Sequence, residues 1–186
     1  MRIEILGGRV IDPVTALDKQ TGLYIHNRKI VAVGTAPDGF IADKRIDAQG
    51  QIVCPGFIDL SARLREPGQT HKANIQSETR AAASAGFTSL SIPPDTTPVI
   101  DTPAVVELIK DKAEQCAYAH IYPVAALTQK LAGKELSAMY ALKQAGCIAV
   151  SNGQAAIENL LVLRRAMEYA ATHDLLFIYS PQEQAL

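Results

Sequence analysis

The side chains best suited to binding a metal are dispersed along the chain. Four histidines lie far apart in the sequence: His26, His71, His120 and His173. Three cysteines are equally dispersed and include no Cys-x-x-Cys pair: Cys54, Cys116 and Cys147. Neither a zinc knuckle nor a disulfide framework is indicated, because both need closely spaced or paired residues. We therefore expect isolated surface or capping histidines, free thiols, and no bound cofactor.

The composition is that of an ordinary globular protein. Of 186 residues, 48% are hydrophobic and 20% are charged, and the formal net charge is −1. A near-neutral chain without a polybasic run argues against a nucleic-acid partner. No window approaches the ~18 apolar residues of a membrane span, and residues 1–5 do not open a signal peptide. We expect a cytoplasmic protein.

Residues 1–53 have the pattern of short strands joined by turns. Arg2–Leu6 precedes two glycines, and Leu23–Ile25 and Lys29–Val33 flank a turn at His26-Asn27-Arg28, where asparagine tolerates a positive φ. This predicts a small antiparallel sheet, which is marginal alone and must pack on something else.

From residue 52 the pattern changes to alternating strands and helices. Ile52–Leu60 is an apolar run typical of a strand buried on both faces. Further strands are expected over 87–92, 119–126, 147–151 and 175–179, and helices over 72–85, 102–117, 137–144 and 155–173. Such alternation predicts a parallel sheet with right-handed crossovers. It fits either a doubly wound sheet or the start of a (β/α)8 barrel, which needs about 250 residues when complete.

Several motifs favour the barrel. The segment Pro55–Leu60 resembles the signature that opens the barrel in cyclic amidohydrolases, the dihydroorotases, hydantoinases and allantoinases. That family continues with His-x-His-x-Arg and, in dihydroorotases, Glu-Pro-Gly, where this chain has Ser61–Gly68. Lys72, the Ala-rich Arg80–Thr88 and Pro93–Pro98 are similar to later family motifs in the same order. The resemblance covers the whole chain.

The resemblance implies an α/β fold in two parts. Residues 1–53 would form a β-sandwich portion, and residues 54–186 the N-terminal part of a (β/α)8 amidohydrolase barrel with about five strands. The second half of the barrel and the closing sandwich strands would lie outside this sequence. Unpaired strand edges would then make the chain unstable alone.

Two positions decide the chemistry that the resemblance implies. Residues two apart on a strand project to the same side, so positions 61 and 63 should face the barrel mouth together. The family has two zinc-binding histidines there, and this chain has Ser61 and Arg63. A guanidinium stays protonated. At about 4 Å and an effective dielectric near 20, it repels a divalent ion by roughly 8 kcal/mol. We expect no metal.

Two more family positions have changed. An aspartate that follows the fourth strand in the family corresponds to Asn152, whose amide cannot act as a general base. A histidine that follows the fifth strand falls at Tyr179 or Ser180. The resemblance therefore implies a degenerate metal centre at 61, 63, 152 and 179–180, without catalytic residues.

The substrate-binding positions are partly retained. Arg65 matches the family's arginine that pairs with a substrate carboxylate, for which a planar guanidinium is suited. A salt bridge from Arg65 to Glu66 or Asp95 is an equally good interpretation. Asp95 stands where the family has asparagine and would repel an anionic substrate. We expect a vestigial substrate site at these two residues.

Three functions remain open. Inactive dihydroorotase-like chains accompany aspartate carbamoyltransferase in some bacteria, so the resemblance implies a non-catalytic assembly subunit for its catalytic chain in pyrimidine biosynthesis, itself a homo-oligomer. The alternative enzyme is a zinc-dependent cyclic amide hydrolase (dihydroorotase) with an unusual ligand set. The third is a metal-free module in which Arg65 binds an anionic metabolite.

Overall fold

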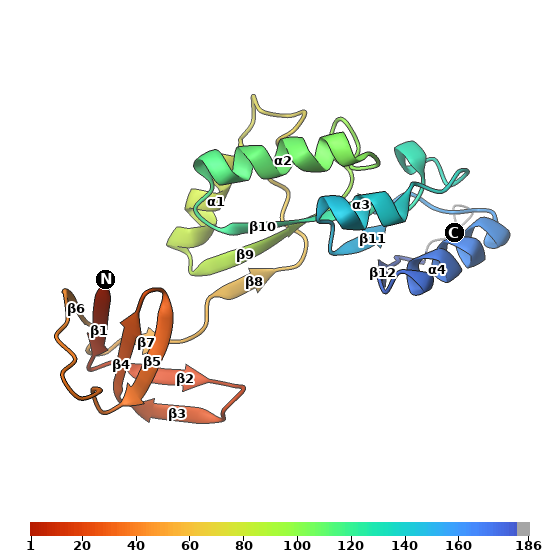
Figure 1. Cartoon of the computed structure of the whole chain (residues 1–186). Coiled ribbons are helices and arrows are strands. Elements are labelled where there is room, and N and C mark those ends of the chain that lie inside the picture. The colour runs from red at the N-terminus through yellow and green to blue at the C-terminus, as the bar shows by residue number, and fades with distance from the viewer. Residues whose placement is uncertain (182–186) are drawn as a thin grey trace. The chain divides into compact units, whose positions relative to one another are not determined.

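The computed structural model describes residues 1–181 and divides into two compact units, which meet in the sequence between Pro55 and Gly56. Each unit is described by itself (Figure 1). Within residues 1–181, no helix combines the length and the apolarity needed to cross a membrane.

The first unit consists of two small sheets. One has the strand order β5-β4-β1-β6 and the other β3-β2-β7. Their bounds are β1 Arg2–Leu6, β2 Arg9–Asp12, β3 Leu17–Gln20, β4 Gly22–His26, β5 Lys29–Gly34, β6 Lys44–Asp47 and β7 Ile52–Val53. The predicted hairpin is confirmed as β4 and β5, and Asn27 and Arg28 in its turn have φ values of 51° and 64°. Strands β3 and β6 were not predicted, because their polar sequences lack an alternating pattern.

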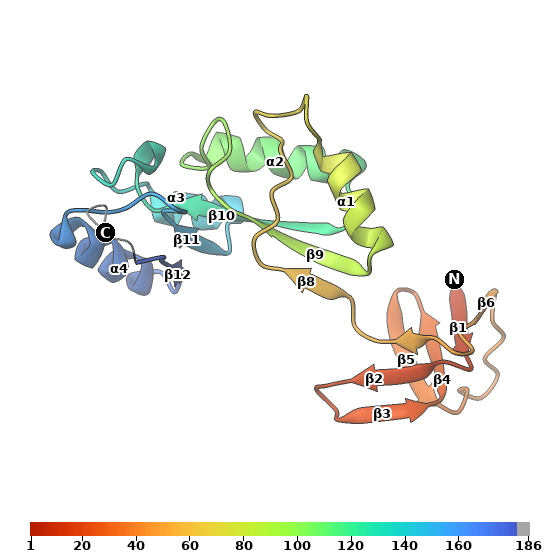
Figure 2. The ribbon, with the colours of Figure 1, turned by 180° about the vertical axis from the view of Figure 1, so that it is seen from behind.

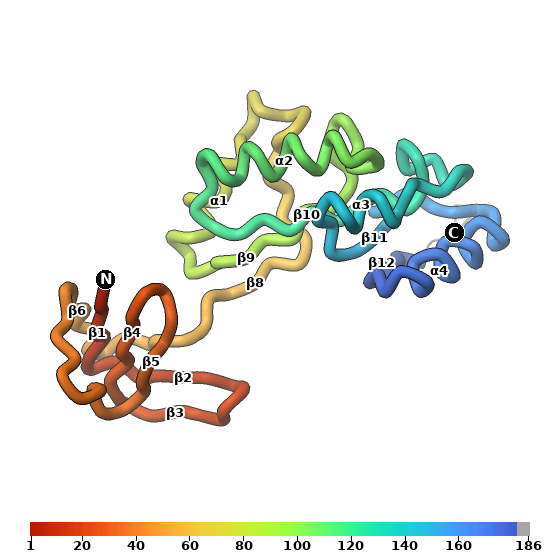
Figure 3. Tube along the Cα trace, in the orientation of Figure 1, coloured from red at the N-terminus to blue at the C-terminus, as the bar shows by residue number. Residues whose placement is uncertain are grey.

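The second unit contains the expected five parallel strands. Their order is β12-β11-β10-β9-β8, so each strand lies beside the next one in the chain (Figure 3). The strands are β8 Phe57–Asp59, β9 Phe87–Ile92, β10 His120–Ala126, β11 Ala149–Ser151 and β12 Leu176–Ile178. A doubly wound sheet would reverse this order at a switch point. The sequential order is that of a barrel.

Four helices cover one face of this sheet (Figures 1 and 2). They are α1 Ile75–Ser84, α2 Pro103–Cys116, α3 Met139–Ala145 and α4 Leu160–Thr172, with a short 3₁₀ turn at Gln129–Leu131. The core between helices and sheet includes these fully buried side chains: Ile75, Ile92, Val106, Ile109, Leu127, Leu142 and Val150. Each deletion of such a side chain to alanine typically costs about 2–5 kcal/mol, so this layer holds the strand ends in place.

The prediction of one buried strand over Ile52–Leu60 is wrong. The run divides into β7, which pairs with β2 in the first unit, and β8, which pairs with β9 in the second. Phe57, Ile58 and Leu60 are 53%, 63% and 77% exposed. The reason is that β8 is an edge strand with one neighbour among the described residues, so its side chains are covered from one side only.

Two helices begin later than predicted. Helix α1 begins at Ile75 rather than at 72, because the Asn74 side chain accepts a hydrogen bond from the Ser77 N–H and caps it. Helix α4 begins at Leu160 rather than at 155, where Asn159 caps the Leu161 N–H. Helix α3 ends close to its predicted end, where Gly146 caps it in the left-handed region with a φ of 114°.

The cysteines differ in burial and therefore in the expected reactivity of their thiols. Cys147 lies in the core, and burial raises the pKa of its thiol to about 12, whereas Cys54 is exposed. Since the thiolate is the reactive form, we expect Cys54 to react with a disulfide reagent at pH 8 at least about a hundredfold faster than Cys147. Mass spectrometry of labelled peptides measures both rates, and in denaturant they should become equal. Comparable rates in the folded protein would contradict this packing.

Candidate functional site

The carboxyl ends of the parallel strands form a small hollow at one edge of the sheet. We call it the mouth hollow; it measures about 180 Å³. Part of its lining comes from the carboxyl ends of β8, β11 and β12 and the segments after them: Ser61, Arg63, Ser151, Gly153, Gln154, Tyr179 and Ser180. The structure therefore brings together four of the positions that the sequence singled out, 61, 63, 179 and 180.

Arg63 forms an ion pair that the sequence did not suggest. Its Nη2 lies 2.9 Å from Oδ2 of Asp95, which follows β9, and the two side chains are 45% and 31% exposed. The pair joins the loops after β8 and β9. A half-exposed pair of this kind contributes only about 0–1 kcal/mol to stability. Its main effect is on the electrostatics of the site, where each charge partly neutralises the other.

The ion pair changes the electrostatic case against a metal. Asp95 offsets much of the positive charge of Arg63, so repulsion of a cation is weaker than for an isolated guanidinium. The main argument against a bound metal is then the lack of suitable donor atoms. A protonated guanidinium has no lone pair to offer, and the hydroxyls of Ser61, Tyr179 and Ser180 are poor substitutes for imidazole.

The described residues do not fit a zinc ion. Among residues 1–181, no group of three or more His, Cys, Asp or Glu side chains is placed to hold a metal. His71 is exposed in the loop after β8 and does not line the mouth hollow. His120 begins β10, at the opposite end of the strands, and His173 caps α4 and lies against Tyr140, with ring centroids 4.7 Å apart.

Arg65 lies in a second hollow beside the first. This arginine hollow, of about 120 Å³, is lined by Arg63, Arg65, Gln69, Asp95, Thr96 and Thr97 among others. Arg65 is exposed with a φ of 63°, and within the described chain its side chain has no hydrogen bond or ion pair. Both suggested salt bridges are absent there, because Asp95 pairs with Arg63 and Glu66 pairs with Lys112. The guanidinium is available to an anion.

Asn152 is placed differently from the other predicted positions. Its side chain is buried, with 1% exposure, and it is not part of the mouth-hollow lining, which takes Ser151 and Gly153 instead. The Asn152 Oδ1 accepts a hydrogen bond of 2.7 Å from the Thr128 hydroxyl, and Nδ2 donates to the Ala155 carbonyl at 2.9 Å. The amide therefore joins the loops after β10 and β11.

Thr128 is a residue that sequence reasoning missed. It is fully buried, and its Oγ1 also accepts a hydrogen bond from the Gly133 N–H at 2.9 Å. A threonine at a strand end carries no sequence signal for this role, since its partners lie 5 and 24 residues away. Only the folded loops show it.

The comparisons with known proteins agree on one family. A family model described as dihydro-orotase-like matches residues 50–183. A dihydroorotase-like protein of Pseudomonas aeruginosa is 50% identical over 186 residues, and a dihydroorotase of Syntrophotalea carbinolica is 40% identical over 186 residues. In both cases the alignment takes in 100% of this chain and 44% of the relative.

Solved structures agree on the fold. An L-hydantoinase from Arthrobacter aurescens superposes with a TM-score of 0.83 at 16% identity, over 98% of this chain and 41% of that protein. A dihydroorotase gives a TM-score of 0.62 at 15% identity, over 98% of this chain and 51% of that one. The predicted fold class, the N-terminal part of an amidohydrolase barrel, is confirmed.

The fold and the strand-end site thus define an amidohydrolase-type (β/α) barrel segment. The family model matches most of the chain, and one relative is 50% identical over the whole length of this chain. Together these matches identify the family. It belongs to the dihydroorotase-like family, and it spans less than half the length of the curated relatives that it matches.

The position of Asn152 has a measurable consequence. We expect Asn152→Asp to lower the free energy of unfolding by about 3 kcal/mol, since it buries a charge and removes the donor to the Ala155 carbonyl. Denaturant unfolding measures this, and Thr128→Val provides the partner for a double-mutant cycle, in which the two effects should not add. Unchanged stability together with new zinc binding would place the side chain in the mouth instead.

Proposed function

We propose that this protein is a non-catalytic dihydroorotase homologue, which serves as a structural assembly subunit for the aspartate carbamoyltransferase catalytic chain in de novo pyrimidine biosynthesis. It would act in the cytoplasm as a homo-oligomer. The observation that carries the proposal is the Arg63–Asp95 ion pair at the strand ends, where the family's first two metal ligands are expected. A guanidinium there supplies charge without a metal donor.

The relatives give partial support. Proteins named dihydroorotase-like are 50% identical to this chain, and those named dihydroorotase are 37–42% identical. A pyrimidine-pathway role fits both names. Loss of catalysis and association with a transcarbamoylase are the further steps that we propose for this chain.

The open sheet supports a role in assembly. Strands β8 and β12 each have one neighbour among the described residues, and apolar side chains beside them are exposed: Phe57, Ile58, Leu60, Leu176 and Ile178. Unpaired edges and exposed apolar surface of this kind call for covering strands. We propose that, in the whole protein, the covering strands come from the part of the sequence that the longer relatives have and this chain does not.

A zinc-dependent cyclic amide hydrolase is the second candidate. It is favoured by the relatives named dihydroorotase and by Arg65, whose guanidinium has no partner among residues 1–181 and suits a carboxylate. Such an enzyme would take its metal ligands from residues outside the described part of the chain, together with unusual donors at Ser61 or Tyr179.

Association is the direct test of the first candidate. The full-length protein, mixed with the aspartate carbamoyltransferase catalytic chain of the same organism, should form a complex larger than either component. Light scattering after size exclusion measures its mass, and a transcarbamoylase for another substrate is the control. Separate elution of the two proteins at micromolar concentration would refute the assembly role.

Metal content separates the two candidates. We expect the full-length protein to purify with substoichiometric zinc and without turnover of dihydroorotate. Replacing the changed donors together, in Ser61→His, Arg63→His and Asp95→Asn, should raise its zinc affinity, because two imidazoles then face the mouth without a guanidinium. Calorimetry with zinc measures the gain, and Ser61→His alone, which keeps Arg63, is the matched control. Stoichiometric zinc with turnover in the natural protein would establish the enzyme.

A further inference from the structure

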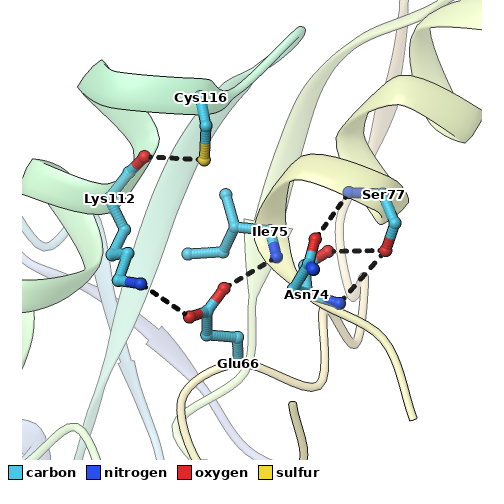
Figure 4. Close-up of polar contacts among 6 residues, drawn as sticks. All are labelled: Glu66, Asn74, Ile75, Ser77, Lys112 and Cys116. Atoms are coloured by element: carbon cyan, nitrogen blue, oxygen red, sulfur yellow. Dashed lines mark hydrogen bonds and ion pairs between the residues drawn. The ribbon is translucent and has the colours of Figure 1, made fainter. Parts of the chain in front are cut away.

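The loop between β8 and α1 carries the three site residues Ser61, Arg63 and Arg65, and Glu66 follows them directly. The Glu66 side chain is 13% exposed and is held by two contacts on different helices (Figure 4). Its Oε2 accepts a hydrogen bond of 3.0 Å from the Ile75 N–H at the start of α1. Its Oε1 lies 3.2 Å from Lys112 Nζ on α2.

The contact with α1 meets an electrostatic need of that helix. Ile75 is the first residue of α1, and its N–H has no partner within the helix. A carboxylate at this point is also favoured by the helix dipole. The N–H groups of Asn74 and Ser77 are satisfied locally, by the reciprocal hydrogen bonds between these two residues that Figure 4 shows. Glu66 is thus a second cap, supplied from nine residues earlier in the chain.

The contact with α2 connects the loop to the core. Lys112 lies on the same helix as Val106 and Ile109, which are fully buried against the sheet. On the other side of Arg65, the Arg63–Asp95 pair fastens the same loop to the segment after β9. Arg65 therefore lies between two anchored residues, while its own guanidinium has no partner in the described chain.

We propose that Glu66 is a positioning residue, which fixes the arginine-bearing loop at the strand ends by tying it to α1 and α2. A loop held in this way presents Arg65 in one orientation and loses little conformational freedom when an anion or a partner protein meets it. This inference goes beyond the proposed function and does not depend on it, since the same loop is needed for assembly, for ligand binding or for catalysis.

Hydrogen exchange of the full-length protein, followed by mass spectrometry, tests the proposal. Lys112→Met keeps the aliphatic stem and removes only the ion pair, so we expect exchange in residues 61–75 to become roughly tenfold faster, with β9–β11 unchanged. Glu66→Ala removes both contacts and should have a larger effect. Lys112→Arg should restore the natural rate, and Lys134→Met, at an exposed lysine on another loop, is the matched control.

Trypsin gives a second reading of the same loop. The sequence around Arg63 and Arg65 is untouched in Lys112→Met, so faster cleavage after these two residues reports a change in the loop's mobility alone. Natural rates of exchange and cleavage in both Lys112→Met and Glu66→Ala would overturn the proposal. An increase spread evenly over the whole second unit, or a failure of Lys112→Arg to restore the loop, would overturn it too. None of these results bears on whether aspartate carbamoyltransferase is bound.

Discussion

The parallel direction of β8 to β12 is the constraint on which the site depends. Because the strands follow one another in sequential order and run the same way, the segment after each strand meets the others at one edge of the sheet. Ser61, Arg63, Tyr179 and Ser180 are more than a hundred residues apart at the extremes, and they line one hollow for this reason. The helices that cover one face of the sheet share a hydrophobic core with its strands, and this packing fixes the positions of the strand ends.

At this edge, two changes from the family pattern have combined into one interaction. The resemblance treated Arg63 and Asp95 as separate losses, one of a metal ligand and one of a neutral substrate contact. In the structure they form an ion pair. Each charge offsets the other, so an anion near Arg65 meets less repulsion from Asp95 than the sequence suggested, and the case against a metal depends on missing donors more than on charge.

Polar side chains near the two hollows hold neighbouring loops together. Asn152 and Thr128 join the loops after β10 and β11, and Glu66 joins the loop after β8 to two helices. Each of the three pairs with at least one backbone group, as buried polar groups in folded proteins generally require. Such residues can persist in a protein whether or not it catalyses a reaction.

The sequence alone determined the five parallel strands, the hairpin of the first unit, the approximate C-terminal ends of α1 and α3, and the family. These follow from local periodicity, from turn residues and from motif order, which a linear pattern can carry. The prediction of one strand over Ile52–Leu60 was wrong, because apolar composition does not say which sheet a residue joins. Only the tertiary structure decided that Asp95 pairs with Arg63, that Asn152 is buried away from the mouth hollow, and that Glu66 meets Lys112. Each depends on residues from separate loops or helices, whose distances are set by how strands and helices pack together.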